Sequence, residues 1–233
     1  MKHFFGVLGG METAATDTYL ARLRRLSTHD ALNYVLLNDA VPVAQSPIQT
    51  AHYLRLNESF HQLLALAPDF LVIPSHFAYF WLDDLQRQTT IPILNMPRDS
   101  IAAINQLTPG AQRIGLLGPQ DVVLQSIYDQ ELLTAGYQPV HPSAEIIEET
   151  TTLLVQDIRA RHFVDRTLFH KLITDMLRLG ADAVILGCSE LALANLREPA
   201  PHLPVIDPQA VLVAHTLADA LGTANFATSS RQL

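Results

Sequence analysis

The sequence of 233 residues contains a single cysteine, Cys188, and a single tryptophan. One cysteine excludes an intramolecular disulfide and every zinc site that is built from several thiolates. Scarce cysteine is typical of proteins in reducing compartments, so we expect a cytoplasmic location. The ten histidines form no ligand motif of the H-E-x-x-H kind, and we expect no bound metal.

Positive charge and long apolar runs are scarce as well. Lys and Arg number 15 against 23 Asp and Glu, which gives a formal net charge of -8. A chain this acidic is a poor match for nucleic acid, whose phosphates require clustered cations. No apolar run approaches the roughly 18–20 residues that a membrane helix needs. We therefore expect neither nucleic acid nor a membrane as a partner.

The sequence does contain an internal repeat. Three apolar segments of the first half match three of the second half, in the same order and at offsets of 109 to 113 residues: 6–9 with 115–118, 66–75 with 179–188, and 91–94 with 203–206. Three matches in one order predict a duplicated unit of about half the chain. We expect a first domain at 1–107, a second domain at 108–209, and a last helix within 210–233 that packs back on the first domain.

Each half alternates short apolar runs with longer segments of helical spacing. The expected strands are 4–8, 35–37, 70–73, 91–96, 114–117, 184–186 and 205–206. The expected helices include 53–64, 80–85, 99–107, 122–134, 153–161, 164–179 and 210–221. Short apolar runs bounded by Gly, Pro, Asn or Asp are typical of buried parallel strands. The alternation predicts two α/β domains, each with a parallel sheet covered by helices on both faces.

The repeat places Ser75 and Cys188 at equivalent positions, each after a strand and at the start of a helix. Ligands of open α/β sheets bind beyond the carboxyl ends of the strands. If the domains face each other about a pseudo-twofold axis, these two side chains flank one substrate in the interdomain cleft. A helix N-terminus lowers the pKa of a thiol from about 8.5 towards neutrality, so Cys188 can act as a base next to a carboxylate. The alternative is that Cys188 is a small buried apolar residue.

Two neighbouring features complete this candidate site. Gly10 ends a Gly-Gly pair after the first strand, a turn whose backbone N–H groups can hold an anion. The pair lacks the G-x-G-x-x-G spacing and the P-loop lysine, so we expect no nucleotide. His76 follows Ser75 directly and is expected at the same cleft.

Two motifs resemble those of the aspartate/glutamate racemase family. The segment 6–16 is similar to that family's G-G-M-G-P-x-A-T motif, and 187–191 reads G-C-S-E-L where the family has G-C-T-E-L. The resemblance covers essentially the whole chain and includes 204–207. It implies two flavodoxin-like domains, a homodimer, and racemisation without pyridoxal phosphate, metal or nucleotide, by two cysteines on opposite faces of the substrate Cα.

The resemblance also implies roles for residues around the two motifs. Backbone amides near Gly10 and Met11 and at the helix starts are expected to hold the substrate carboxylate. Ser189 and Glu190 of the second motif are expected to contact the substrate. Where the family has a lysine in the second domain, this chain has Arg159, which can hold a carboxylate through two hydrogen bonds. The alternative for Arg159 is a solvated position on a helix face.

The chain departs from the family in several places. P-S-H-F-A-Y at 74–79 stands where P-C-N-T-x-H is expected, so Ser75 replaces the first cysteine. A hydroxyl is much less acidic than a thiol, although Ser75 can relay a proton through His76 or water. Phe77 makes this side of the pocket more apolar. Glu12 and Thr13 replace a glycine and a proline, and 41–46 lacks an arginine for the distal carboxylate.

The leading hypothesis is a cofactor-independent racemase of a small acidic amino acid, such as aspartate or glutamate, with Cys188 and Ser75 as the catalytic pair. The second is a single-cysteine decarboxylase or isomerase of the same superfamily, similar to arylmalonate decarboxylases. The third is a homologue that binds a small acid without turnover. A further possibility is that Ser75 is an engineered replacement of cysteine.

Overall fold

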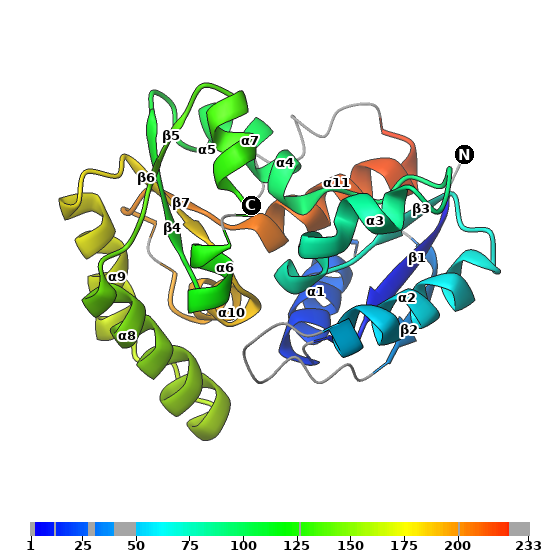
Figure 1. Ribbon diagram of the computed structural model, residues 1–233, viewed down its shortest axis with the longest axis horizontal. Helices are drawn as coiled ribbons and strands as arrows, with labels where there is room; N and C mark the ends of the chain where they lie inside the picture. The colour runs from blue at the N-terminus through cyan, green and yellow to red at the C-terminus, as the bar shows by residue number, and fades with distance from the viewer. Residues whose placement is uncertain are drawn as a thin grey trace. The chain divides into compact units, whose positions relative to one another are not determined.

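The computed structural model describes residues 3–11, 13–27, 31–39, 50–125, 127–199 and 201–223. The chain forms two compact units, one made of Met1–Met96 with Gln209–Leu233 and the other of Pro97–Pro208. The first unit is thus built from both ends of the chain, and Figure 1 shows its last helix in orange and red. Three features singled out in the sequence, Glu12, 41–46 and the end of the expected 210–233 helix beyond 223, lie outside the described residues.

The first unit contains a parallel sheet with the strand order β2-β1-β3. Its strands are β1 (Phe4–Gly9), β2 (Asn33–Asn38) and β3 (Phe70–Val72). Its helices are α1 (Thr13–Leu26), α2 (Thr50–Leu64), the 3-10 helix η1 (His76–Trp81), α3 (Leu82–Gln86) and α11 (Pro208–Leu221), of which all but the first residue lies in this unit. The strand expected at 91–96 is reduced to one bridge between Leu71 and Ile93. Proline at 92 cannot donate to a ladder, and the chain turns into a helix at Met96.

The core of the first unit joins β1 and β3 to helices from both ends of the chain. The rings of Phe5 and Phe70 stack with centroids 5.1 Å apart, and α11 contributes Leu212 and Val213, both fully buried. Burying each such side chain contributes about 1.5–3 kcal/mol. Helix α11 is therefore an integral part of this core.

The second unit contains a parallel sheet with the strand order β5-β4-β6-β7. Its strands are β4 (Arg113–Leu117), β5 (Gln138–Val140), β6 (Ala183–Leu186) and β7 (Val205–Ile206). Its helices are α4 (Met96–Ala102, in this unit from its second residue), α5 (Ile104–Leu107), α6 (Gln120–Leu124), α7 (Asp129–Thr134), α8 (Ala144–Thr152), the π-helix η2 (Leu153–Arg159), α9 (Arg166–Arg178) and α10 (Ser189–Arg197). Two parallel sheets among helices confirm the predicted α/β class.

Four details of the second unit differ from the sequence expectation. The helix expected at 99–107 is divided into α4 and α5, and it lies in this unit although we expected the first domain to extend to 107. Strand β5 was not expected, because Gln-Pro-Val carries no apolar run. The helix expected at 122–134 is divided into α6 and α7. The helix expected to begin at 153 begins at Ala144, because the Ser143 hydroxyl accepts a hydrogen bond from the N–H of Ile146 and caps the helix.

An aspartate fixes the start of the first strand in each sheet. Asp69 Oδ2 accepts a hydrogen bond from the N–H of Phe4 at 2.7 Å. Asp182 Oδ2 accepts from the N–H groups of Gln112 and Arg113 at 2.9 and 2.8 Å. These two aspartates occupy equivalent positions in the sequence repeat, so the alignment of the two halves is confirmed in three dimensions.

The Asp182 bonds predict a pH-dependent contribution to stability. Hydrogen bonds from the backbone of Gln112 and Arg113 lower the pKa of the Asp182 carboxyl. A carboxyl whose folded pKa is depressed stabilises the fold above its unfolded pKa of about 3.9, and this stabilisation is lost as the pH falls through the folded pKa. We expect Asp182→Ala to lower Tm at neutral pH, by an amount that shrinks in acid.

Thermal unfolding of the wild type and the variant across the acidic range measures this difference. Asp182→Asn keeps an acceptor oxygen without the charge and should fall between the two. A gap in Tm that is the same at neutral pH and well below pH 4 would contradict the assignment, because Asp182 would then act without titrating.

No helix among the described residues is long and apolar enough to cross a membrane.

Candidate active site

The carboxyl edge of the first sheet gathers most of the residues expected in the first domain. Gly10 and Met11 follow β1, while Ser75 and His76 follow β3. The two strands are parallel neighbours in the register Val7 to Val72, so the segments that follow them leave the sheet at the same edge. All four residues are buried. The structure thus brings this half of the predicted site together.

The turn after β1 is held tightly. Gly10 has φ +97, and a Cβ added to it would lie 2.0 Å from the carbonyl oxygen of Asp39 at the end of β2. The N–H of Gly10 donates to Thr16 Oγ1 at 3.1 Å. This N–H, which we expected to hold an anion, is therefore already engaged. Hydrogen bonds from Ser59 and Arg55 lower the pKa of the adjacent Asp39 carboxyl and fix that side chain in turn.

Ser75 directly precedes η1 with an extended backbone, and the residue is 4% exposed. Its Oγ is buried and has no hydrogen-bond partner within the part of the chain that the structure describes. An unsatisfied buried hydroxyl costs about 1–3 kcal/mol and is rare in native proteins, where it calls for an explanation. Because the hydroxyl has no structural bond to give up, it is suited to meet a ligand.

Aromatic residues after Ser75 hold this segment in place. The Tyr79 hydroxyl lies 3.1 Å from the carbonyl oxygen of Ile73 and 3.2 Å from that of Leu94, and bridges the two segments. Phe77 is buried, with its ring centroid 6.1 Å from that of Phe80. Tyr79 is therefore a structural residue, which the sequence did not reveal.

Cys188 occupies the corresponding place in the second unit. It follows β6 after Gly187 and directly precedes α10, with an extended backbone and a side chain that is 1% exposed. Ser75 and Cys188 thus share their position after a strand, their backbone conformation, their burial and their place before a helix. The structure confirms the equivalence that the repeat predicted.

Glu190, two residues after Cys188 in the sequence, forms an ion pair with Arg159, which lies 31 residues earlier in the chain. Arg159 is the last residue of the π-helix η2, and its Nε and Nη2 both lie 2.6 Å from Glu190 Oε1. The Ser189 hydroxyl donates to Glu190 Oε2 at 3.0 Å. Both carboxylate oxygens of Glu190 thus have partners, so this side chain orients Arg159. Short π-helical segments are frequent at functional sites.

The Glu190 contacts predict a loss of stability on substitution. The Glu190 side chain is 4% exposed and that of Arg159 is 37% exposed. We expect Glu190→Gln to lower the free energy of unfolding by about 1–3 kcal/mol, because it weakens charge-assisted hydrogen bonds to a buried oxygen. Urea unfolding measures the change.

Glu198→Gln is the matched control for this variant. Glu198 pairs with Arg166 at 3.9 Å across a surface where both side chains are exposed. Exposed pairs contribute about 0–1 kcal/mol. Equal losses in the two variants would show that Glu190 is an ordinary surface charge.

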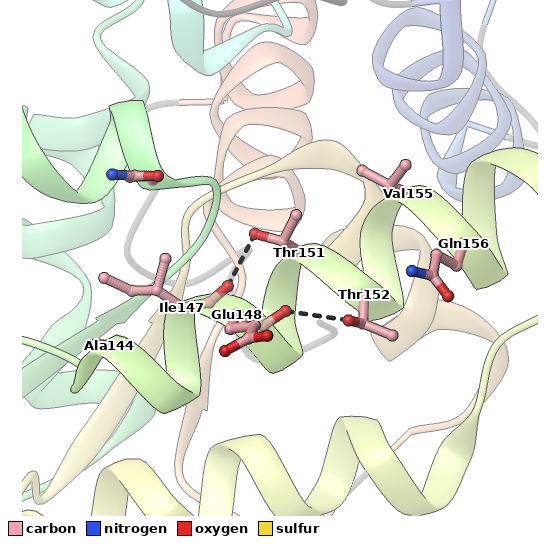
Figure 2. Close-up of a pocket in the computed structure, with 8 residues that line it drawn as sticks. Ala144, Ile147, Glu148, Thr151, Thr152, Val155 and Gln156 are labelled. Carbon is pink, nitrogen blue, oxygen red and sulfur yellow. Dashed lines mark hydrogen bonds between the residues drawn. The ribbon is translucent and has the colours of Figure 1, made fainter.

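The second unit also contains a hollow of about 550 Å³, lined by Gln120, Ala144, Ile147, Glu148, Thr151, Thr152, Val155 and Gln156. All but Gln120 come from α8 and η2, so the hollow runs along one continuous helix. Figure 2 shows the Thr151 and Thr152 hydroxyls turned onto the carbonyl oxygens of Ile147 and Glu148, at 2.8 and 3.2 Å. These hydroxyls are used within the helix, and Cys188 and Arg159 do not line the hollow. It is not the candidate active site.

Gln209 is a polar residue that sequence reasoning missed. It lies at the start of α11 and is 1% exposed, and its Nε2 donates to the carbonyl oxygen of Ala15 at 2.9 Å. The only signal in the sequence is an amide side chain at the head of the apolar run A-V-L-V-A. Among the described residues, no group of three or more His, Cys, Asp or Glu side chains is placed to hold a metal.

Comparison with known proteins shows the family. The sequence profile of the Asp/Glu/Hydantoin racemase family matches residues 8–216. The broad specificity amino-acid racemase RacX of Bacillus subtilis is 21% identical over 150 residues, which span 64% of this chain and 63% of that protein.

Solved structures share the fold. The aspartate racemase of Picrophilus torridus matches with a TM-score of 0.74 and 23% identity over 94% of both chains. The glutamate racemase of Thermus thermophilus matches with a TM-score of 0.63 and 19% identity, over 96% of this chain and 83% of that one. With a profile match that spans most of its length, this chain belongs to the Asp/Glu/Hydantoin racemase family.

Proposed function

We propose that the protein is a cofactor-independent racemase of a small acidic amino acid, with aspartate and glutamate as the first candidates. The observation that carries this proposal is the equivalence of Cys188 and Ser75: buried side chains after matching strands, each directly before a helix. Membership of a racemase family supports the reaction type. The acidic substrate follows from Arg159, a partly exposed cation in the second unit.

The proposed reaction begins with removal of the Cα proton by the Cys188 thiolate. The proton moves to Sγ, and the electron pair left on Cα is delocalised into the substrate carboxylate. The N-terminus of α10 favours the thiolate through the partial positive charge at that end of the helix dipole. Arg159, oriented by Glu190, holds a substrate carboxylate through paired hydrogen bonds.

Inversion requires that a proton return to the other face of Cα. We assign this step to Ser75, whose unsatisfied hydroxyl can donate its proton and regain one from the neighbouring His76 or from water. A serine hydroxyl is a much weaker acid than a thiol, so at neutral pH almost none of it is ionised to act as a base. Exchange of the Cα proton is therefore expected to be faster for the enantiomer whose proton faces Cys188, whereas inversion has the same kcat/KM in both directions because enantiomers have equal free energies.

A second candidate is a single-thiol reaction such as decarboxylation, in which Cys188 only delivers a proton. The observation that favours it is the residue at position 75. Ser75 stands where the family has its first cysteine, and the buried, apolar Phe77 follows two residues later. A reaction of this kind needs one proton donor and no base on the opposite face.

Proton NMR in D2O distinguishes the candidates. Loss of the Cα–H signal is followed separately for L- and D-aspartate and for L- and D-glutamate, and the configuration of the product is determined. Exchange from both enantiomers with inversion supports the racemase. Exchange from one enantiomer without inversion means that Cys188 works alone as a base and contradicts the racemase, as does no exchange from any of the four. Loss of a carboxyl group as CO2, with uptake of one deuteron at the same carbon, supports the single-thiol decarboxylation.

A further inference from the structure

Several buried side-chain atoms of the first unit, Asn57 Oδ1 among them, have no hydrogen-bond partner in the described part of the chain. Two of these atoms, Ser75 Oγ and Gln209 Oε1, come from segments far apart in sequence, and their residues are 4% and 1% exposed. Buried polar atoms without partners are rare in native proteins, and a catalytic or binding role is one established reason for them.

The orientation of the Gln209 amide follows from its one hydrogen bond. The carbonyl oxygen of Ala15 can only accept, so the group that faces it at 2.9 Å is the amide Nε2. The other end of the amide, Oε1, is therefore the atom without a partner. A carbonyl-type oxygen is an acceptor only, so any group that satisfies it must be a donor.

Gln209 is tied to the turn that forms the candidate site. Ala15 lies in the first turn of α1, next to Thr16, whose Oγ1 accepts the hydrogen bond from Gly10. This turn follows β1, and β1 is the neighbour of β3, which leads to Ser75. The Gln209 amide therefore contacts the first turn of the helix that leaves the carboxyl edge of this sheet, the edge at which Ser75 also lies and at which ligands of α/β proteins bind.

We propose that Gln209 is a specificity-determining residue that accepts a hydrogen bond from the primary ammonium group of the substrate. The identity of the ligand as an amino acid rests on the proposed function. The carboxylates of aspartate and glutamate are acceptors at neutral pH, so the ammonium group is the donor that these molecules offer. Gln209 thereby selects amino acids against the corresponding acids that lack the amine.

The experiment measures equilibrium binding to the full chain by titration calorimetry, with ligands in pairs: aspartate with succinate, glutamate with glutarate, and alanine with propionate. Gln209→Met has a similar shape but no acceptor, and Tyr19→Phe is its matched control. The Tyr19 hydroxyl makes another bond between α1 and α11, donating to Thr216 Oγ1 at 2.9 Å. Each variant thus removes one bond between these helices, but only the Gln209 variant removes the proposed ligand contact.

We expect the wild type to bind the amine-bearing member of at least one pair more tightly, and Gln209→Met to weaken that binding by roughly ten- to a hundredfold while the amine-free partner changes little. Tyr19→Phe should preserve the preference. No preference in the wild type, or a Gln209→Met variant in which both members of a pair weaken equally, overturns the assignment. The proposed racemase is judged separately by Cα–H exchange, so a preference lost in Gln209→Met supports this inference even where no exchange occurs.

Discussion

Replacement of Cys188 by alanine is expected to slow Cα proton exchange by about 10²–10⁴-fold, the usual contribution of a positioned general base. Cys188 is the one thiol in the chain and directly precedes α10, so no other side chain can supply a thiolate there. Alanine leaves the backbone unchanged and removes only Sγ. The rate is measured by proton NMR in D2O, under the conditions in which the wild type exchanges.

Ser75→Ala is the comparison variant, and it separates the two faces of the reaction. In a racemase it should slow inversion of both enantiomers, and it should slow Cα–H exchange more for the enantiomer whose proton faces Ser75 than for the one whose proton faces Cys188. In a single-thiol reaction it should change the rate far less than the loss of Cys188. An alanine variant at 188 that exchanges at the wild-type rate would remove the thiol from the mechanism and with it both candidate reactions.

The second large effect is expected at Gly10. Gly10→Ala should lower the free energy of unfolding by about 3–5 kcal/mol, because two costs add at this residue. The backbone has φ +97, where an L side chain is strained, and the new Cβ would lie 2.0 Å from the Asp39 carbonyl oxygen. Backbone atoms cannot rotate away as a flexible side chain can, so the end of β2 has to move. Urea unfolding measures the change.

Two other glycines separate these costs. Gly110 and Gly136 have φ +85 and +87, and an added Cβ would meet nothing within 4 Å at either position. Alanine at these positions should cost only the conformational strain of about 1–2 kcal/mol. If Gly10→Ala costs no more than these variants, the contact between the β1 turn and the end of β2 is not tight in solution.

The repeat made much of the fold predictable. In both halves an aspartate, Asp69 or Asp182, directly precedes an apolar run that forms a strand. The matched positions of Ser75 and Cys188 after these strands therefore followed from one alignment of the two halves. Local signals failed where tertiary contacts decide the structure. Strand β5 is Gln-Pro-Val, without an apolar pattern, and is a strand because it pairs with β4.

Site residues that directly follow a strand could be placed from the sequence. Residues whose positions depend on packing between distant segments could not. Arg159 was identified by its alignment with a lysine of the family, but its contact with Glu190 depends on a π-helical turn that no periodicity signals. Gln209 was missed because its partner, Ala15, lies at the other end of the chain. No local pattern encodes a contact of that kind.

The assembly of the first unit from both ends of the chain has a consequence for biosynthesis. Domains generally fold as units while the chain emerges from the ribosome. The second unit is contiguous and can close as soon as residues up to 208 have emerged, whereas the core around Phe5 and Phe70 stays open until α11 is made. The core of the first unit is therefore completed after that of the second. Until Leu212 and Val213 have been synthesised, the apolar strands of the first unit remain exposed and can associate with other molecules.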